Sequence, residues 1–187
     1  TFSDEAIPLM QEENKLISEY DKLISSAKID YDEKTLNLSQ MQPYMESKDR
    51  KIRKEAYEKW SGFFKENEAK FDIIYDKLVK VRNQIALKLG FDSFTQLGYL
   101  RMGRSDYNAK DVRKFREHVL NYIVPISNKL RERQAKRIGV DKFKYYDIPL
   151  NFLSGNPAPK GNKEWIMRHT KKMYEELSPE TGEFINF

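Results

Sequence analysis

The sequence has 187 residues, of which 39% are hydrophobic and 34% are charged, and it contains no cysteine. This length suits one domain or one large lobe, the hydrophobic share excludes intrinsic disorder, and the lack of cysteine excludes disulfide frameworks and thiolate metal sites. No apolar run approaches the roughly 18 residues of a membrane span and nothing resembles a signal peptide, so we expect a folded cytoplasmic protein without a membrane partner.

Apolar residues recur at helical spacing through most of the chain, beginning near Ser3. An alternation of apolar and polar residues predicts a short β-hairpin at about 28–38. Ser47 is a candidate cap for the next helix. The clearest apolar stripe then leads to a stop at Gly90. Its members are Phe71, Ile74, Leu78, Val81, Ile85 and Leu89.

A short helix predicted over 91–100 leads into a polar loop, for which we expect the bounds 98–108. Asn108, followed three residues later by Asp111, resembles a capping box that begins a long helix. We expect this helix to kink near Pro125 and to end at Gly139.

The last quarter of the chain combines an extended segment with two helices. Its aromatic part predicts one further strand at about 143–150, within an extended segment over 142–162. Asn162 and Ser178 are candidate caps for the two final helices. The expected class is therefore mainly α, with a hairpin and one further strand. We expect residues 1–187 to form a single helical section.

The net charge of +5 is concentrated in two basic clusters. Clusters of this kind can contact phosphates, which makes a nucleic-acid-binding module one alternative function. They can equally be solvated helix faces, because acidic residues flank both. One cluster contains Lys48, Arg50, Lys51, Arg53 and Lys54, and the other contains Lys129, Arg131, Arg133, Lys136, Arg137, Lys142 and Lys144.

The residues offer little catalytic chemistry. His118 and His169 are the two histidines, and neither has a second histidine three or four positions away, so no helical zinc pair exists. No serine has an evident histidine and acid beside it in the sequence. Taken alone, the residues indicate only a helical lobe without an assigned function, and a helical scaffold or protein-interaction module is a further alternative.

Arginine and tyrosine are concentrated in the loop and in the aromatic segment. A guanidinium can bind a carboxylate and a phenol can bind a backbone carbonyl, so such residues can orient a peptide. Alternatively, the arginines can fix the loop by binding carbonyls at a helix C-terminus, and the tyrosines can be part of the core. The residues that we expect to contact the substrate are Arg101, Arg104, Tyr145 and Tyr146.

Three long segments resemble oligoendopeptidase F, a member of the thimet oligopeptidase family of zinc metallopeptidases. They are YMESKDRKIRKEAYEKW (44–60), RNQIALKLGFDSFTQLGYLRMGRSDYN (82–108) and KMYEELSPETGEF (172–184). The similarity extends over essentially the whole chain in the same order. It implies an interior section of a longer peptidase, truncated on both sides and lacking the H-E-x-x-H motif, which comes later in the family.

The resemblance implies a helical lobe of a zincin-type oligopeptidase that hydrolyses short peptides inside a deep channel. In the parent protein, zinc held by two histidines and a glutamate would polarise the scissile carbonyl, and the motif glutamate would act as general base. This section would supply part of the shell and of the channel wall, hold no zinc and be inactive alone. Its expected partners are short peptides and the remainder of the same polypeptide, with self-association through faces exposed by truncation, and not nucleic acid.

Overall fold

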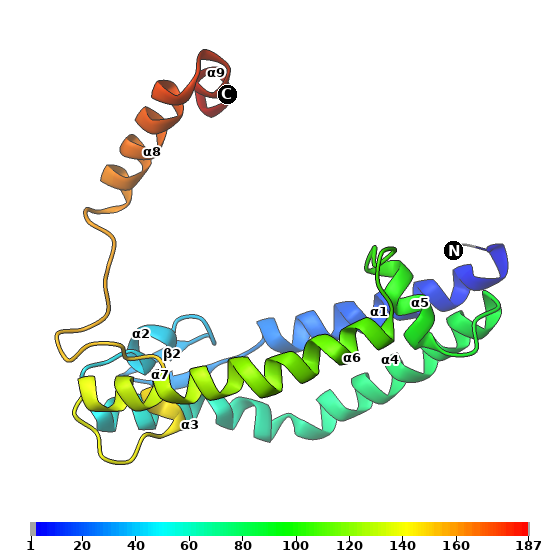
Figure 1. Cartoon of the computed structure of the whole chain (residues 1–187), viewed down its shortest axis with the longest axis horizontal. Helices are drawn as coiled ribbons and strands as arrows, with labels where there is room; N and C mark the ends of the chain where they lie inside the picture. The colour runs from blue at the N-terminus through cyan, green and yellow to red at the C-terminus, as the bar shows by residue number, and fades with distance from the viewer. Residues whose placement is uncertain (1–2, 187) are drawn as a thin grey trace. The chain divides into compact units, whose positions relative to one another are not determined.

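The structure is a computed structural model that describes residues 3–186, and it is mainly helical with one two-stranded sheet (Figure 1). The chain divides between Gly155 and Asn156 into two compact units. The mainly helical class and the hairpin predicted from the sequence are confirmed. Within the described residues, no helix combines the length and the apolar character needed to cross a membrane.

The first unit is built on an antiparallel pair of helices. A 3-10 turn (Asp4–Ala6) leads into α1 (Ile7–Ser25), which packs along α4 (Glu68–Lys88). The short helix α5 (Phe94–Arg101) packs against the C-terminal part of α4 (Figure 1). The stripe predicted for α4 forms the centre of this contact. Five buried side chains make up its core: Leu16, Val81, Ile85, Ala86 and Leu97.

A second apolar cluster lies beneath the hairpin. Strands β1 (Ile29–Tyr31) and β2 (Lys34–Leu36) pair antiparallel through a two-residue turn, in which Asp32 and Glu33 both have positive φ, as a type I′ turn requires. The short helix α2 (Gln42–Met45) and the longer α3 (Arg50–Glu66) follow. Ile29, Leu36, Met41 and Ala56 are buried together between these elements.

Glycines end two of the helices, as predicted. After α4, Gly90 adopts a φ of +80°, its N–H donates to the carbonyl of Leu87, and the N–H of Phe91 donates to the carbonyl of Ala86 at 2.9 Å. This pair of hydrogen bonds is the Schellman motif, which favours glycine because of its positive φ. Gly139, with φ +67°, ends α7 in the same way.

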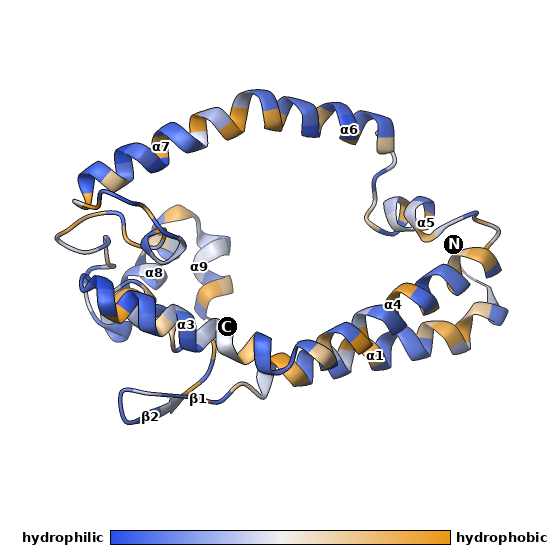
Figure 2. Ribbon diagram, turned by 90° about the horizontal axis from the view of Figure 1, so that it is seen from below, coloured by the Kyte–Doolittle hydropathy of each residue, from blue (hydrophilic) through white to orange (hydrophobic). Residues whose placement is uncertain are grey.

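Residues 109–137 form one long helix, hereafter helix 109–137, made of α6 (Ala109–His118), a π-helical turn (Val119–Ile123) and α7 (Val124–Arg137). The π turn lies just before Pro125, where the sequence predicted a kink; proline cannot donate a backbone hydrogen bond there. Most apolar side chains of this helix are exposed, and Figure 2 shows orange residues along its middle. They include Phe115, Leu120, Tyr122, Ile123, Val124, Ile126 and Leu130.

The strand predicted at 143–150 is wrong, because this segment forms a 3-10 turn, Tyr145–Asp147. The side chain of Asp147 accepts a hydrogen bond from the backbone N–H of Lys144 at 3.0 Å, and the backbone N–H of Asp147 donates to the carbonyl of Lys144 at 2.9 Å. Aspartate side chains compete in this way with sheet pairing and favour turns. The aromatic alternation in the sequence reflects packing of the two tyrosines, not a strand.

The second unit is a pair of helices, α8 (Lys163–Leu177) and α9 (Pro179–Asn186). Both predicted caps are present: the Asn162 side chain accepts from the N–H of Trp165 at 2.9 Å, and the Ser178 hydroxyl accepts from the N–H of Thr181 at 3.2 Å. The two helices approach closely at Gly182, where an added Cβ would lie 3.3 Å from Glu175 Cα.

Candidate functional site

The four residues predicted to contact substrate fall in two places in the first unit. Arg101 and Arg104 precede helix 109–137, whereas Tyr145 and Tyr146 follow it. At 1.5 Å per residue this helix is roughly 40 Å long. Since its ends are so far apart, the two arginines and the two tyrosines belong to separate surfaces and do not form one subsite.

Arg101 is bound by Glu13, an acid 88 positions earlier in the sequence. Its Nη1 lies 2.8 Å from Glu13 Oε2, and Arg82 Nε donates to Glu13 Oε1 at 2.7 Å. The side chain of Glu13 is only 9% exposed, so these hydrogen bonds satisfy a carboxylate that is otherwise removed from water. Arg101 therefore ties the end of α5 to α1 and acts as a positioning residue for the loop that follows.

Arg104 has a different environment. Its guanidinium carbon lies 5.0 Å from the centre of the Tyr99 ring and 5.8 Å from that of Tyr107, and we call these three residues the Arg104 cradle. Both distances allow cation–π attraction. Among residues 3–186, Arg104 has no acidic partner within ion-pair distance. The ring faces thus fix the guanidinium, while its N–H donors stay available.

The loop that carries Arg104 is defined at both ends. Gly103, with φ +66°, ends α5, and the backbone N–H of Arg104 donates to the carbonyl of Tyr99 at 3.0 Å. At the other end the predicted capping box is present: Asn108 Oδ1 accepts from the N–H of Lys110 at 2.9 Å, and Asp111 Oδ2 accepts from the N–H of Asn108 at 3.0 Å. These local motifs position the cradle without long-range contacts.

Two hollows adjoin the Arg104 cradle. One, of about 550 Å³, lies between α5 and the loop, and the other, of about 470 Å³, lies along the first turns of α6. Arg104 and Tyr107 line both hollows, and Val112 and Phe115 line the second. The cradle therefore separates two open, mainly apolar depressions, each large enough for a side chain of a bound peptide.

Tyr145 and Tyr146 pack against α3. The ring of Tyr145 lies 4.6 Å from that of Tyr57 and 5.1 Å from that of Tyr146. The guanidinium of Arg50 lies 5.3 Å from the centre of the Tyr146 ring. Tyr145 nevertheless stays 47% exposed, so part of it is accessible to a ligand.

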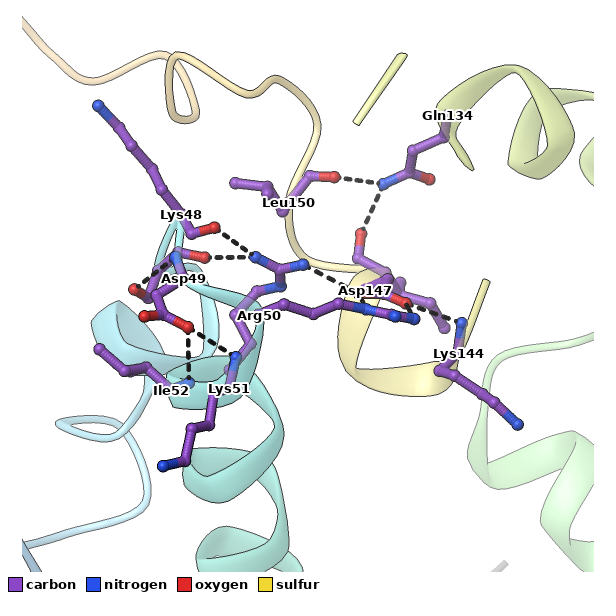
Figure 3. Close-up of polar contacts among 12 residues, drawn as sticks. Lys48, Asp49, Arg50, Lys51, Ile52, Gln134, Lys144, Asp147 and Leu150 are labelled. Atoms are coloured by element: carbon purple, nitrogen blue, oxygen red, sulfur yellow. Dashed lines mark hydrogen bonds and ion pairs between the residues drawn. The ribbon is translucent and has the colours of Figure 1, made fainter. Parts of the chain in front are cut away.

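Beside these tyrosines is a cluster that the sequence did not predict. Asp147 is fully buried and accepts from Arg50 Nη2 at 2.8 Å and from Arg53 Nη2 at 2.9 Å; these three residues are the Asp147 cluster. Figure 3 shows Arg50 and the Lys144 backbone directed at Asp147, and Gln134 directed at the Leu150 carbonyl. The cluster fastens the segment after α7 to the start of α3.

The start of α3 explains why the cluster forms. Asp49, not the predicted Ser47, caps the helix by accepting from the N–H of Lys51 at 2.7 Å. Arg50 and Arg53, three positions apart, project from the first turn on one side. Positive charge is unfavourable at a helix N-terminus, and Asp147 neutralises it. The spacing of these arginines could have indicated a shared anion, but nothing in the sequence indicates Asp147.

The pKa values of two buried carboxyl groups follow from these contacts. Burial raises the pKa of Glu13, but the hydrogen bonds and charges of Arg82 and Arg101 outweigh it and hold the pKa below its usual 4.5. Burial likewise raises the pKa of Asp147, and the hydrogen bonds from Arg50, Arg53 and the Lys144 backbone hold it below 3.8. Both groups are thus carboxylates at neutral pH.

We expect the protein to lose stability as the pH falls below about 5. Because both pKa values are lower in the folded state, the unfolded chain binds more protons in acid, so the stabilisation present above the unfolded pKa is lost as pH falls through the folded values. Urea midpoints measured from pH 7 to pH 3 should fall, and less so in the double variant Glu13→Gln/Asp147→Asn. A midpoint that stays constant down to pH 3 would contradict this assignment.

The described residues contain no group of three or more histidine, cysteine, aspartate or glutamate side chains that could hold a metal ion. His118 lies on α6 beside the ring of Tyr122. His169, on α8, stacks on Trp165 with ring centres 3.6 Å apart, and its Nδ1 lies 2.8 Å from the Trp165 carbonyl. Neither histidine is part of a zinc site built from these residues.

Comparison with known families places this helical chain among the peptidases. The sequence model of peptidase family M3 matches residues 43–152, which is more than half of the chain. The chain therefore belongs to peptidase family M3. No curated protein matches the sequence.

Solved structures match the whole chain. A protein described as an oligoendopeptidase F from Bacillus anthracis strain Ames is 53% identical with a TM-score of 0.91. A PZ peptidase A solved with an inhibitor is 57% identical with a TM-score of 0.93, and a further protein described as an oligoendopeptidase F is 52% identical with a TM-score of 0.93. The predicted resemblance to oligoendopeptidase F is confirmed. All 187 residues are covered in each comparison, but they span only 33–34% of those chains.

Proposed function

We propose that the chain is one section of a zinc-dependent oligoendopeptidase that hydrolyses short peptides. The observation that carries this proposal is the identity of 52–57% over the full chain to two proteins described as oligoendopeptidase F and to a PZ peptidase A, at TM-scores of 0.91–0.93. Because the chain spans a third of their length, we assign it part of the helical shell and not the reaction itself.

The zinc ion of the proposed parent does not fit the residues of this chain. His118 and His169 lie on helices of different units and face aromatic rings. A catalytic zinc site needs three protein ligands, two of them commonly histidines one helical turn apart. We therefore place the metal and the hydrolytic groups in other parts of the polypeptide, derive no step of hydrolysis here, and expect the chain alone to be inactive.

Within the proposed parent, the Arg104 cradle and the Tyr145 surface are the candidate substrate-contacting parts of this chain. Arg104 has unused donors beside two hollows, and Tyr145 is partly exposed. Arg101 supports the first of these surfaces through Glu13. Tyr146, beneath Arg50, supports the second.

The exposed apolar residues in the middle of helix 109–137, between Leu120 and Leu130, are assigned to contact with the remainder of the same polypeptide. Six large apolar side chains between Leu120 and Leu130 are at least 40% exposed, from Val124 at 40% to Leu120 at 65%, and none of them lines the hollows beside Arg104. Covering such a surface releases water and is favourable, so the uncovered chain should self-associate. Sedimentation velocity at rising protein concentration should show association, and a concentration-independent monomer would contradict it. The cytoplasmic location remains a prediction.

A nucleic-acid-binding function is not favoured. Arg50 and Arg53, which belong to the first basic cluster, are committed to Asp147. In the second cluster, Arg137 Nε donates to the carbonyl of Asn151 at 2.6 Å and Arg131 donates to Gln134 at 2.8 Å. These contacts leave fewer cations to neutralise phosphates. Retention of labelled DNA or RNA that declines steeply with salt would reopen this alternative.

The proposal is tested by comparing substrates of different size. A longer polypeptide that carries these residues within an M3 peptidase should cleave a fluorescence-quenched short peptide and leave a folded protein intact, because a deep channel admits only short, flexible chains. Cleavage of both substrates at similar rates would contradict the channel, and cleavage of neither would contradict the peptidase assignment.

A further inference from the structure

We propose that the Arg104 cradle is a carboxylate-binding subsite for peptides, in which Arg104 forms a paired hydrogen bond with the carboxylate. This inference rests on the proposed function, since it names what the cradle would bind on the peptide. The carboxylate can be the C-terminus of the peptide or an acidic side chain, and the chemistry of recognition is the same for both.

The first reason is that Arg104 is unlike the other arginines that stack on rings in this unit. Arg50, Arg82, Arg101 and Arg137 also stack on aromatic rings, but each of them donates to a carboxylate or a backbone carbonyl. Arg104 stacks on two rings, and its guanidinium donates to no side chain or carbonyl among residues 3–186. Among the described residues, its charge is therefore compensated by the two ring faces.

The second reason is geometric. A guanidinium presents its donors in its own plane, in a fork that matches the two oxygens of a carboxylate, whereas aromatic rings attract its faces. Ring contacts and a carboxylate can thus be accommodated together. The rings also restrict the side chain before binding, which reduces the conformational entropy lost when the hydrogen bonds form.

The third reason is the surroundings of the cradle. The hollow beside Val112 and Phe115 is mainly apolar and can hold the side chain next to the bound carboxylate. Two acids also line the hollows, Asp106 and Asp111. Asp111 is occupied in the capping box, and neither acid lies within 4.0 Å of an Arg104 nitrogen. Their charge should weaken binding of anions lacking an apolar neighbour, so we expect acetate to bind less tightly than a peptide.

The test uses the 187-residue chain and three peptides: N-acetyl-Ala-Ala-Phe with a free carboxylate, its C-terminal amide, and N-acetyl-Ala-Glu-Phe amide. Titrations are followed by NMR through the ring protons of Tyr99 and Tyr107. We expect the free acid to bind with a Kd on the order of 1 mM and the neutral amide at least about ten-fold more weakly. Binding by the glutamate peptide would identify the side chain as a second source of the carboxylate.

Variants of the cradle supply the decisive comparison. Arg104→Gln should weaken binding of the free acid about ten-fold or more. The affinity of Arg104→Lys for the free acid should lie between those of Arg104→Gln and the unchanged chain, because lysine keeps the charge but lacks the forked donors of a guanidinium. Arg113→Gln removes an exposed arginine of α6 outside both hollows and should change the Kd less than about two-fold. Circular dichroism would verify that each variant is folded.

Two outcomes would overturn the inference. One is equal affinity for the free acid and the neutral amide, and the other is unchanged binding by Arg104→Gln. Either result would leave the peptidase assignment standing, because that assignment is tested by hydrolysis in the longer polypeptide and not by binding to this chain.

Discussion

Replacing Asp147 with alanine should destabilise the first unit by about 3–5 kcal/mol, a large fraction of the stability of an ordinary domain. The substitution leaves Arg53, whose side chain is 2% exposed, without its acidic partner in a place that water does not reach. The Nε of Arg53 is already buried without a partner among the described residues, so the loss of Asp147 leaves two buried donor groups unsatisfied. Urea unfolding followed by circular dichroism measures the effect.

The controls separate charge burial from a simple loss of charge. Asp76→Asn removes an exposed acid that pairs with Lys80 at 2.6 Å, and it should change stability by no more than about 0.5 kcal/mol. The double variant Arg53→Leu/Asp147→Leu removes both buried charges and should be less destabilised than Asp147→Ala. If Asp147→Ala were as stable as Asp76→Asn, the Asp147 cluster would not fasten the segment to α3.

Replacing Ile85 with alanine should lower the free energy of unfolding by about 2–5 kcal/mol, because it leaves a cavity between α1, α4 and α5. Ile85 is fully buried, and its neighbours Leu16 and Leu97 belong to α1 and α5. Because these helices are fixed by their own contacts, the cavity cannot close freely. Leu87→Ala, two positions away on the same helix, is the matched control, because Leu87 is 63% exposed. An equal decrease in the free energy of unfolding for both variants, measured in urea, would contradict the assigned core.

The sequence predicted those parts of the fold that local chemistry determines. Gly90 ends α4 because only a residue that tolerates positive φ completes the Schellman motif, and Asn108 begins helix 109–137 because its side chain caps the first turn. The apolar stripe of α4 predicted its buried side. Each of these features depends on residues within a few positions of one another, which periodicity and capping rules can recognise.

The errors and omissions arise where distant residues meet. In the turn within segment 143–150, the side chain of Asp147 binds the backbone of Lys144 and also two arginines of α3. The arginines lie more than ninety positions earlier in the sequence, and no local pattern encodes that contact. The pairing of Glu13 with Arg101 is equally remote. As a result, the sequence grouped Arg101 with Arg104, although the first is committed to a buried acid and the second has free donors.

The most direct measurement of the central claim is chelator-sensitive hydrolysis of a short peptide by a longer polypeptide that contains these residues. We expect that polypeptide to cleave the peptide, to stop when a chelator removes the metal, and to recover when zinc is restored, whereas residues 1–187 alone cleave nothing. A zinc-loaded longer polypeptide that leaves short peptides intact would contradict the assignment of this chain to the wall of a peptidase.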